Sequence, residues 1–353
     1  GDLDAGADGR RARLRGSGRL PGEQEVARDI GADLVEAPPV GHGVGLEPVE
    51  LVAGVGVPLG VEDRRGEGGG YGGGGMGMPM GAGGLGIGGV IVLGIIGWAL
   101  GIDPRLLIGG AEILTGGGQT QYQQQAPRPT SAPVNDDMSR FVRQVLGSTE
   151  VQWKNIFQKD GQTYRPPKLV MFSGQTRSAC GLAQSAMGPF YCPNDREVYL
   201  DTAFFNELER RFRGCSGKAC QFSQAYVIAH EVGHHVQNSL GILPKVQEAQ
   251  QRAGSKAEAN RLQVRVELQA DCFAGVWANH AEAQKSFLDP GDVDAALQTA
   301  SAIGDDTLQR KAQGTVVPES FTHGSAEQRK RWFMTGFKEG TIKACNTFGA
   351  QSL

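Results

Sequence analysis

The first 70 residues contain no aromatic residue, no methionine and no lysine, and the first lysine of the chain is Lys154. A segment rich in Gly, Ala, Val, Arg and Asp but without aromatic side chains cannot bury enough apolar surface to offset the entropy lost on ordering. We therefore expect residues 1–67 to form a disordered tail, or to reflect a mis-assigned start of translation.

An excess of positive charge is also missing. The formal net charge is −3 at pH 7. Proteins that bind nucleic acids or anionic membrane surfaces through electrostatics carry a basic face or a basic net charge. We therefore expect no nucleic-acid partner.

Charged residues are absent between Glu67 and Asp103. The first part of this stretch, residues 68–84, is a glycine-rich tract of low complexity. It continues into LGIGGVIVLGIIGWALGI, residues 85–102, whose eighteen largely apolar residues are about the minimum that crosses a bilayer as a helix. We predict a single transmembrane helix here, with a buried glycine-rich helix or a cleaved signal peptide as alternatives.

The chain after this segment divides into a linker and a domain. Residues 103–135 include a stretch rich in Gln, Pro and Ser and are interpreted as a flexible linker. Aromatic residues and lysines return in residues 136–353, which are long enough for one domain with a proper core. Arg64 and Arg65 precede the apolar segment and favour a cytoplasmic N-terminus. The domain is then expected outside the cytoplasm, anchored to the bacterial inner (plasma) membrane.

The distribution of cysteines agrees with export. All six follow the apolar segment: Cys180, Cys192, Cys215, Cys220, Cys272 and Cys345. An even number of cysteines on the expected outer side suggests disulfides. Proximity in sequence favours the pairs 180–192 and 215–220, which leaves 272 with 345; buried free thiols are the alternative.

The stretch YVIAHEVGHHVQN carries three of the six histidines. Residues 221–240 are predicted to form a helix, in which His230 and His234 lie one turn apart on the same face. Two imidazoles at this spacing can bind one tetrahedral zinc ion, and Glu231 can act as the general base on a zinc-bound water. His235 points about 100° away and is not expected to be a ligand. A chance occurrence of the motif is the alternative, but its flanks are uncharged, as a buried active-site helix requires.

The third zinc ligand is expected from a second helix, because the chain has Gln237 and Leu240 where a metzincin has Gly and His. Residues 259–280 place Glu267 and Asp271 one turn apart in an apolar setting, where a bare carboxylate is costly. We predict Glu267 as the third ligand. Asp271 is predicted to accept the free ring N–H of a zinc-bound histidine.

Other assignments of these residues stay open. Glu267 could instead pair on the surface with Arg261 or Arg265, and His280 is the alternative ligand. His323 lies in an uncharged loop just before a helix, and is a candidate donor to the oxyanion of the reaction or a surface residue of that helix.

A strand is expected just before the first of these helices. Residues 196–201, REVYLD, alternate in polarity and are predicted to form the edge strand that pairs with an extended substrate.

Several motifs carry a resemblance to known families. HEVGHH followed by ELQAD resembles the gluzincins, and the Glu-x-x-Ala-Asp helix is also seen in the CAAX prenyl endopeptidases. The glycine tract with its single span and six stretches, two of which contain these motifs, resemble more closely the bacterial neutral zinc metallopeptidases of the YpfJ type over about residues 61–353: VEDRRG, DPRLLIGG, SACGLAQSAMGPFYCP, CQFSQAYVIAHEVGHHVQN, ELQADCFAGVWA and FTHGSAEQRKRWF. The resemblance implies a zinc-peptidase site and names no substrate.

These observations predict an α+β, zincin-like domain, mainly helical with a small sheet, behind a single transmembrane helix. The expected function is a membrane-anchored zinc metallopeptidase acting on proteins or peptides. A catalytically idle zinc-binding scaffold of the envelope and a zinc amidase of a non-peptide substrate are the alternatives. The intact Glu231 argues against the scaffold, because a structural zinc needs no base beside it.

Overall fold

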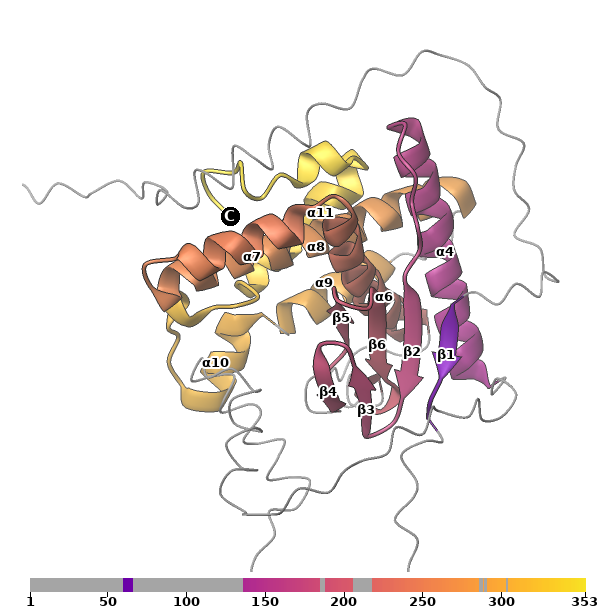
Figure 1. Cartoon of the computed structure of the whole chain (residues 1–353), viewed down its shortest axis with the longest axis horizontal. Coiled ribbons are helices and arrows are strands. Elements are labelled where there is room, and N and C mark those ends of the chain that lie inside the picture. Colours follow the sequence, from indigo (N-terminus) through magenta and orange to yellow (C-terminus); the bar gives the residue numbers. More distant parts are fainter. Residues whose placement is uncertain are drawn as a thin grey trace, which may run out of the picture.

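The structure, a computed structural model, describes residues 60–65, 136–184, 188–205, 218–285, 288, 291–302 and 304–353. Long helices make up most of the described domain, and a small sheet lies beside them (Figure 1). The expected α+β class, mainly helical with a small sheet, is confirmed. The predicted glycine-rich tract, span and linker lie outside the described residues, as do residues 1–59 of the predicted tail.

The helices follow one another through the second half of the chain. They are α4 (Asp137–Lys159), α6 (Lys218–Ser239), α7 (Ile242–Arg252), α8 (Lys256–Lys285), α9 (Asp292–Ala302), α10 (Asp305–Gln313) and α11 (Ala326–Glu339), with 3-10 turns η2 (Pro318–Ser320) and η3 (Ile342–Cys345). The strands are β1 (Val61–Asp63), β2 (Lys168–Phe172), β3 (Gln175–Ser178), β4 (Gly181–Gln184), β5 (Phe190–Cys192) and β6 (Glu197–Asp201).

Four of the strands form one sheet in the order β1-β2-β6-β5, in which β5 is antiparallel and the others are parallel. Both faces of the sheet are covered. Leu169 and Met171 of β2 pack into the main core with α4 and α6, whereas Val170 and Phe172 pack with the β3–β4 hairpin. This burial explains why β2 is an almost continuous apolar run rather than an alternating one.

The strand predicted at 196–201 exists, but it is not an edge strand. β6 lies between β2 and β5, so its backbone groups are already paired on both sides. In the described part of the sheet the two outer strands are β1 and β5. Alternation in the sequence shows that a strand has two different faces but does not show its neighbours.

The strand β1 corrects the predicted domain boundary. Val61–Asp63 pairs with Leu169–Met171, and the side chain of Arg65 donates to Asp136 at 2.7 Å and to the hydroxyl of Ser139 at 2.7 Å. Residues 60–65 therefore belong to the domain rather than to a disordered tail. A strand of three residues cannot be predicted from its own residue pattern, because its stability comes from the sheet that it joins.

The same pairing bears on the predicted membrane topology. No helix in the described ranges is long and apolar enough to cross a membrane. Strands β1 and β2 share a sheet, so residues 61–63 and 168–172 lie on the same side of any bilayer. A single span at residues 85–102 would put them on opposite sides. The pairing of β1 with β2 therefore argues against a single span, but the segment itself lies outside the described residues and the membrane anchor stays a prediction.

Close helix packing in the core depends on glycines. Gly233 of α6 lies against α8, where an added Cβ would be 2.9 Å from the carbonyl oxygen of Ala270. Gly275 of α8 and Gly336 of α11 touch the backbone of each other's helix, and a Cβ at either position would overlap it. The helix α8 is thereby held tightly between α6 and α11.

Two disulfides link elements of the domain, one at the sheet and one at the helices. Cys180–Cys192 joins the β3–β4 hairpin to β5, with Cα atoms 5.8 Å apart. Cys272–Cys345 joins α8 to η3, with Cα atoms 5.6 Å apart. Both pairings predicted from the sequence are confirmed, while the remaining predicted pair includes Cys215, which lies outside the described residues.

Candidate metal centre

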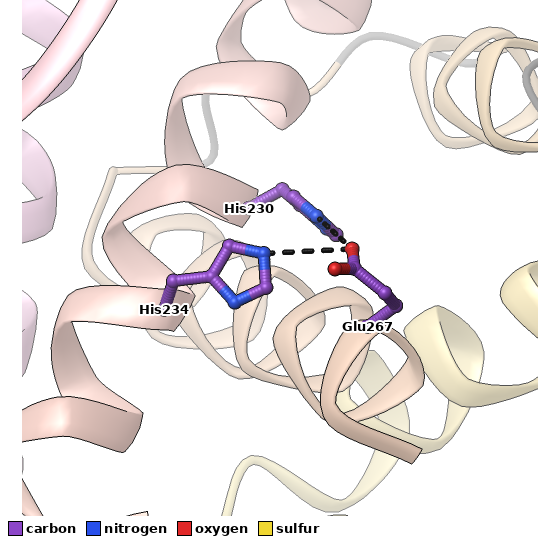
Figure 2. A group of neighbouring side chains, drawn as sticks. All are labelled: His230, His234 and Glu267. Carbon is purple, nitrogen blue, oxygen red and sulfur yellow. Dashed lines mark hydrogen bonds and ion pairs between the residues drawn. The ribbon is translucent and has the colours of Figure 1, made fainter. Parts of the chain in front are cut away.

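Three side chains from two helices converge in the core. His230 and His234 project from the same face of α6, and Glu267 projects toward them from α8 (Figure 2). The Glu267 Oε2 atom lies 3.2 Å from the Nε2 atom of His230 and 3.5 Å from that of His234. Ligands that bind a tetrahedral zinc at about 2.0–2.2 Å lie about 3.3–3.6 Å from one another. The two distances from Glu267 therefore fit such an ion, and all three donor atoms lie within 4.8 Å of one another.

The predicted partner of His230 is in place. Asp271, fully buried, lies with Oδ1 2.8 Å from the Nδ1 atom of His230. The same carboxylate accepts a hydrogen bond from the hydroxyl of Tyr226 at 2.5 Å and two from Arg329, at 2.8 and 2.9 Å. A carboxylate with this many donors is fixed in position, so it fixes the ring of His230 as well.

Charges around the site favour a cation. Burial alone would raise the pKa of Asp271, but Arg329 and His230 outweigh it and lower that pKa to about 2. Burial alone would lower the pKa of His230, yet the charges and hydrogen bonds of Asp271 and Glu267 raise it to about 10. The pKa of Glu267 is held well below its usual value, against the effect of burial, by His234, His323 and His230. Two ionised carboxylates therefore lie in this part of the core: Glu267 faces the Nε2 atoms of both histidines, and Asp271 contacts the other ring nitrogen of His230.

Glu231, the predicted base, follows His230 on α6 and is 8% exposed. A carboxylate is seldom this buried unless it is paired or has a function. Its position beside the first histidine is set by the helix itself, because successive residues differ by about 100° around the axis.

His323 lies close enough to Glu267 for their charges to interact. Its pKa is raised, because the charges of Glu267 and Asp305 and a hydrogen bond to Asp305 outweigh burial. Asp305, at the start of α10, also accepts hydrogen bonds from three successive backbone N–H groups, those of residues 322–324, at 2.6, 2.6 and 3.1 Å. The loop that carries His323 is thus held in one conformation. The imidazole stays partly exposed, at 36%.

The third histidine of the motif has a structural role, as its direction on the helix predicts. His235 is 3% exposed, and its Nε2–H group donates to the carbonyl oxygen of Arg165 at 2.7 Å. Its Nδ1 atom lies 3.1 Å from the hydroxyl of Tyr191, on β5. Burial lowers the pKa of His235 to about 4, so the ring is neutral near pH 7. This residue anchors α6 to the sheet.

The structure places Glu267, and not the alternative ligand His280, beside His230 and His234. His280 lies about 20 Å further along α8 than Glu267, at about 1.5 Å per residue, and bonds the carbonyl oxygen of Gly340 at 2.8 Å. Arg265 donates to the carbonyl oxygens of Thr347 and Ala350, and the carboxylate of Glu267 points toward the two histidines.

Four residues around the site were missed by sequence reasoning: Tyr226, Gln237, Asp305 and Arg329. Tyr226 lies one turn before His230, and its position on that face could have suggested contact with the second helix. Arg329 comes from a helix more than fifty residues after Asp271, and no local spacing connects the two. Only the fold brings them together.

Comparison with known proteins supports the assignment of a zinc-peptidase site to this domain. Residues 58–348 match a family described as "Putative neutral zinc metallopeptidase". The chain belongs to this family. The matched range begins before β1, which agrees with the place of that strand in the domain.

The chain is similar to curated proteins from two bacterial groups. It is 53% identical to the uncharacterized protein YpfJ of Escherichia coli K12 over 232 residues, which cover 66% of this chain and 78% of YpfJ. It is 39% identical to the uncharacterized protein Rv2575 of Mycobacterium tuberculosis H37Rv over 275 residues, which cover 72% of this chain and 85% of Rv2575. No solved structure matches the chain. The resemblance to the YpfJ type is confirmed.

Proposed function

We propose that this protein is a zinc metallopeptidase that hydrolyses peptide bonds in proteins or peptides, with Glu231 as the general base. The observation that carries the proposal is the convergence of His230, His234 and Glu267 on one point, next to Glu231 on α6. A zinc ion held by these three residues would lower the pKa of a water molecule to about 7 and polarise the substrate carbonyl.

The residues of the chain would divide the remaining work. Glu231 would take a proton from the attacking water and deliver it to the departing amine. His323, held by Asp305 and kept partly exposed, would donate a hydrogen bond to the oxygen that gains negative charge. The raised pKa of His323 supports this role, because a donor must carry its proton.

The sheet suggests how an extended substrate would be held. β5 is an outer, antiparallel strand, and Tyr191 on it contacts both His235 and Asn238 of the site helix. A peptide that adds to this edge by backbone hydrogen bonds would pass beside α6. β5 would therefore have the role that the sequence suggested for residues 196–201.

We further propose that the domain works outside the cytoplasm. Its two described disulfides favour an oxidising compartment, since cytosolic thiols are kept reduced.

The proposal is tested by the change Glu231→Gln. This variant keeps the shape of the side chain and the three ligands, so zinc should remain near one equivalent. Loss of the base should lower the hydrolysis of a peptide library by about 10²–10⁴-fold. Glu248→Gln, at a position 72% exposed on α7, is the matched control and should keep full activity.

Two results would decide for the alternatives. Equal peptide hydrolysis by wild type and Glu231→Gln would exclude the proposed mechanism. Zinc binding without cleavage of any peptide would favour the idle scaffold or an amidase.

A further inference from the structure

His234 has a partner of a different kind from that of His230. Gln237, one turn further along α6 and fully buried, places its Oε1 atom 2.9 Å from the Nδ1 atom of His234. Its Nε2 atom donates to the carbonyl oxygen of Val266 at 2.8 Å and to the side-chain oxygen of Gln269 at 3.0 Å. Every polar atom of this amide is therefore engaged.

The surroundings determine which way each amide points. A backbone carbonyl oxygen can only accept, so the group facing Val266 must be the amide N–H₂ of Gln237. The same argument applies to Gln269, the next residue in this chain of hydrogen bonds, which donates through Nε2 to the carbonyl oxygen of Cys345 at 2.9 Å. Two backbone carbonyls thus fix both amides, and Gln269 must present its oxygen to Gln237.

This order fixes the tautomer of His234. Because the oxygen of Gln237 faces the ring, the Nδ1 atom of His234 must carry the proton and donate it. In the neutral ring the Nε2 atom then holds the free lone pair, and it is this atom that lies 3.5 Å from Glu267. A metal binds the unprotonated ring nitrogen, so the arrangement supplies the tautomer that a ligand requires.

We propose that Gln237 and Gln269 are positioning residues that hold His234 in its metal-binding tautomer, as Asp271 does for His230. The inference rests on the proposed function. A neutral amide suits this position, because the site already contains two buried carboxyl groups, those of Glu267 and Asp271. The pair also links the site to η3, since Cys345 is held to α8 by its disulfide with Cys272.

The test compares the zinc dissociation constants of purified variants, measured by competition with a chelator. Gln237→Leu removes the acceptor for His234 and should weaken zinc binding by about 10–100-fold, as for other partners of metal-bound histidines. Gln152→Leu is the matched control: Gln152 is a buried glutamine of α4 that donates to Gln284, outside the site. It should destabilise the fold but leave the zinc dissociation constant unchanged.

A second variant separates positioning from general packing. Gln237→Glu keeps an acceptor facing His234 but can no longer donate to Val266 and Gln269. It should lower the unfolding temperature of the metal-free protein while binding zinc at least ten times more tightly than Gln237→Leu. A purely structural role would make both variants lose stability and zinc affinity in parallel.

The outcomes distinguish this inference from the proposed function. If wild type binds zinc and cleaves peptides while Gln237→Leu keeps the wild-type zinc dissociation constant, the positioning role is wrong and the proposed function stands. If wild type binds no zinc, the proposed function fails and the inference fails with it.

Discussion

Two carboxylates in this site have different roles, and the residues that contact each of them determine which role it has. Glu267 and Asp271 are both buried carboxylates of α8, one turn apart. Glu267 faces two ring nitrogens and is available as a ligand, whereas Asp271 is occupied by Arg329, Tyr226 and His230. Burial is tolerated in both cases because opposite charge or hydrogen bonds offset the loss of water.

This contrast predicts different consequences of matched substitutions. Glu267→Gln replaces an anionic ligand by a poor neutral one, so zinc should be lost and activity with it. Asp271→Asn leaves all three ligands but weakens the hold on His230, so zinc affinity should fall by about 10–100-fold and activity should return at high zinc concentration. Zinc content and turnover, measured on the same preparations, check both. Full zinc in Glu267→Gln would show that another residue is the third ligand.

At the scale of elements, the site depends on how closely α8 approaches α6 and α11. Arg329 reaches Asp271 only because α11 lies against α8 at Gly336, where the two backbones touch. A side chain at this position has no space, and the helices cannot rearrange independently, because the Cys272–Cys345 disulfide joins α8 to the segment that follows α11.

We therefore expect Gly336→Ala to act on the metal site from a distance. The added methyl group would push α11 away from α8, with a cost of about 1–3 kcal/mol in the free energy of unfolding, typical of overpacking. Zinc affinity should fall as well, because Arg329 is carried away from Asp271. Thermal unfolding and chelator competition measure the two effects.

The matched control is Gly254→Ala, where an added Cβ would meet only a side-chain oxygen of Glu258 at 3.5 Å. This variant should leave zinc affinity unchanged. A Gly336→Ala variant with wild-type zinc affinity would contradict the link.

At the scale of the whole molecule, Arg65 and Asp136 lie at the two ends of the stretch 66–135, which falls outside the described residues, and a salt bridge of 2.7 Å joins these two side chains. The intervening stretch contains the apolar segment 85–102. Whatever that segment does, the two ends of the stretch lie together in one folded unit.

This closure predicts the result of a topology experiment. Glu62→Cys, at a side chain 48% exposed on β1, and Glu339→Cys, at an exposed position that ends α11, should react with a membrane-impermeant maleimide from the same side of the bacterial membrane. Labelling of the two positions from opposite sides would support the single span and would contradict the pairing of β1 with β2. Labelling of both from outside would also support the extracytoplasmic location.

Local spacing was enough to predict the residues that the structure brings together in the candidate metal site. Two histidines one turn apart share a face of any helix, and two carboxylates in an apolar helix need a compensating partner, so His230, His234, Glu267 and Asp271 could be assigned before the fold was known. The cysteine pair 180–192 followed from proximity in sequence, and 272–345 was the pair left over once neighbouring cysteines were joined.

The tertiary structure decided whatever depends on neighbours that are distant in sequence. It placed β1 in the sheet, put β6 inside the sheet rather than at its edge, and brought Arg329 to Asp271. It also determined the tautomer of His234, because the bonds that orient Gln237 come from Val266 and Gln269 on another helix. Periodicity in a sequence reports which face of an element is buried, but the identity of the group packed against that face depends on how the whole chain folds.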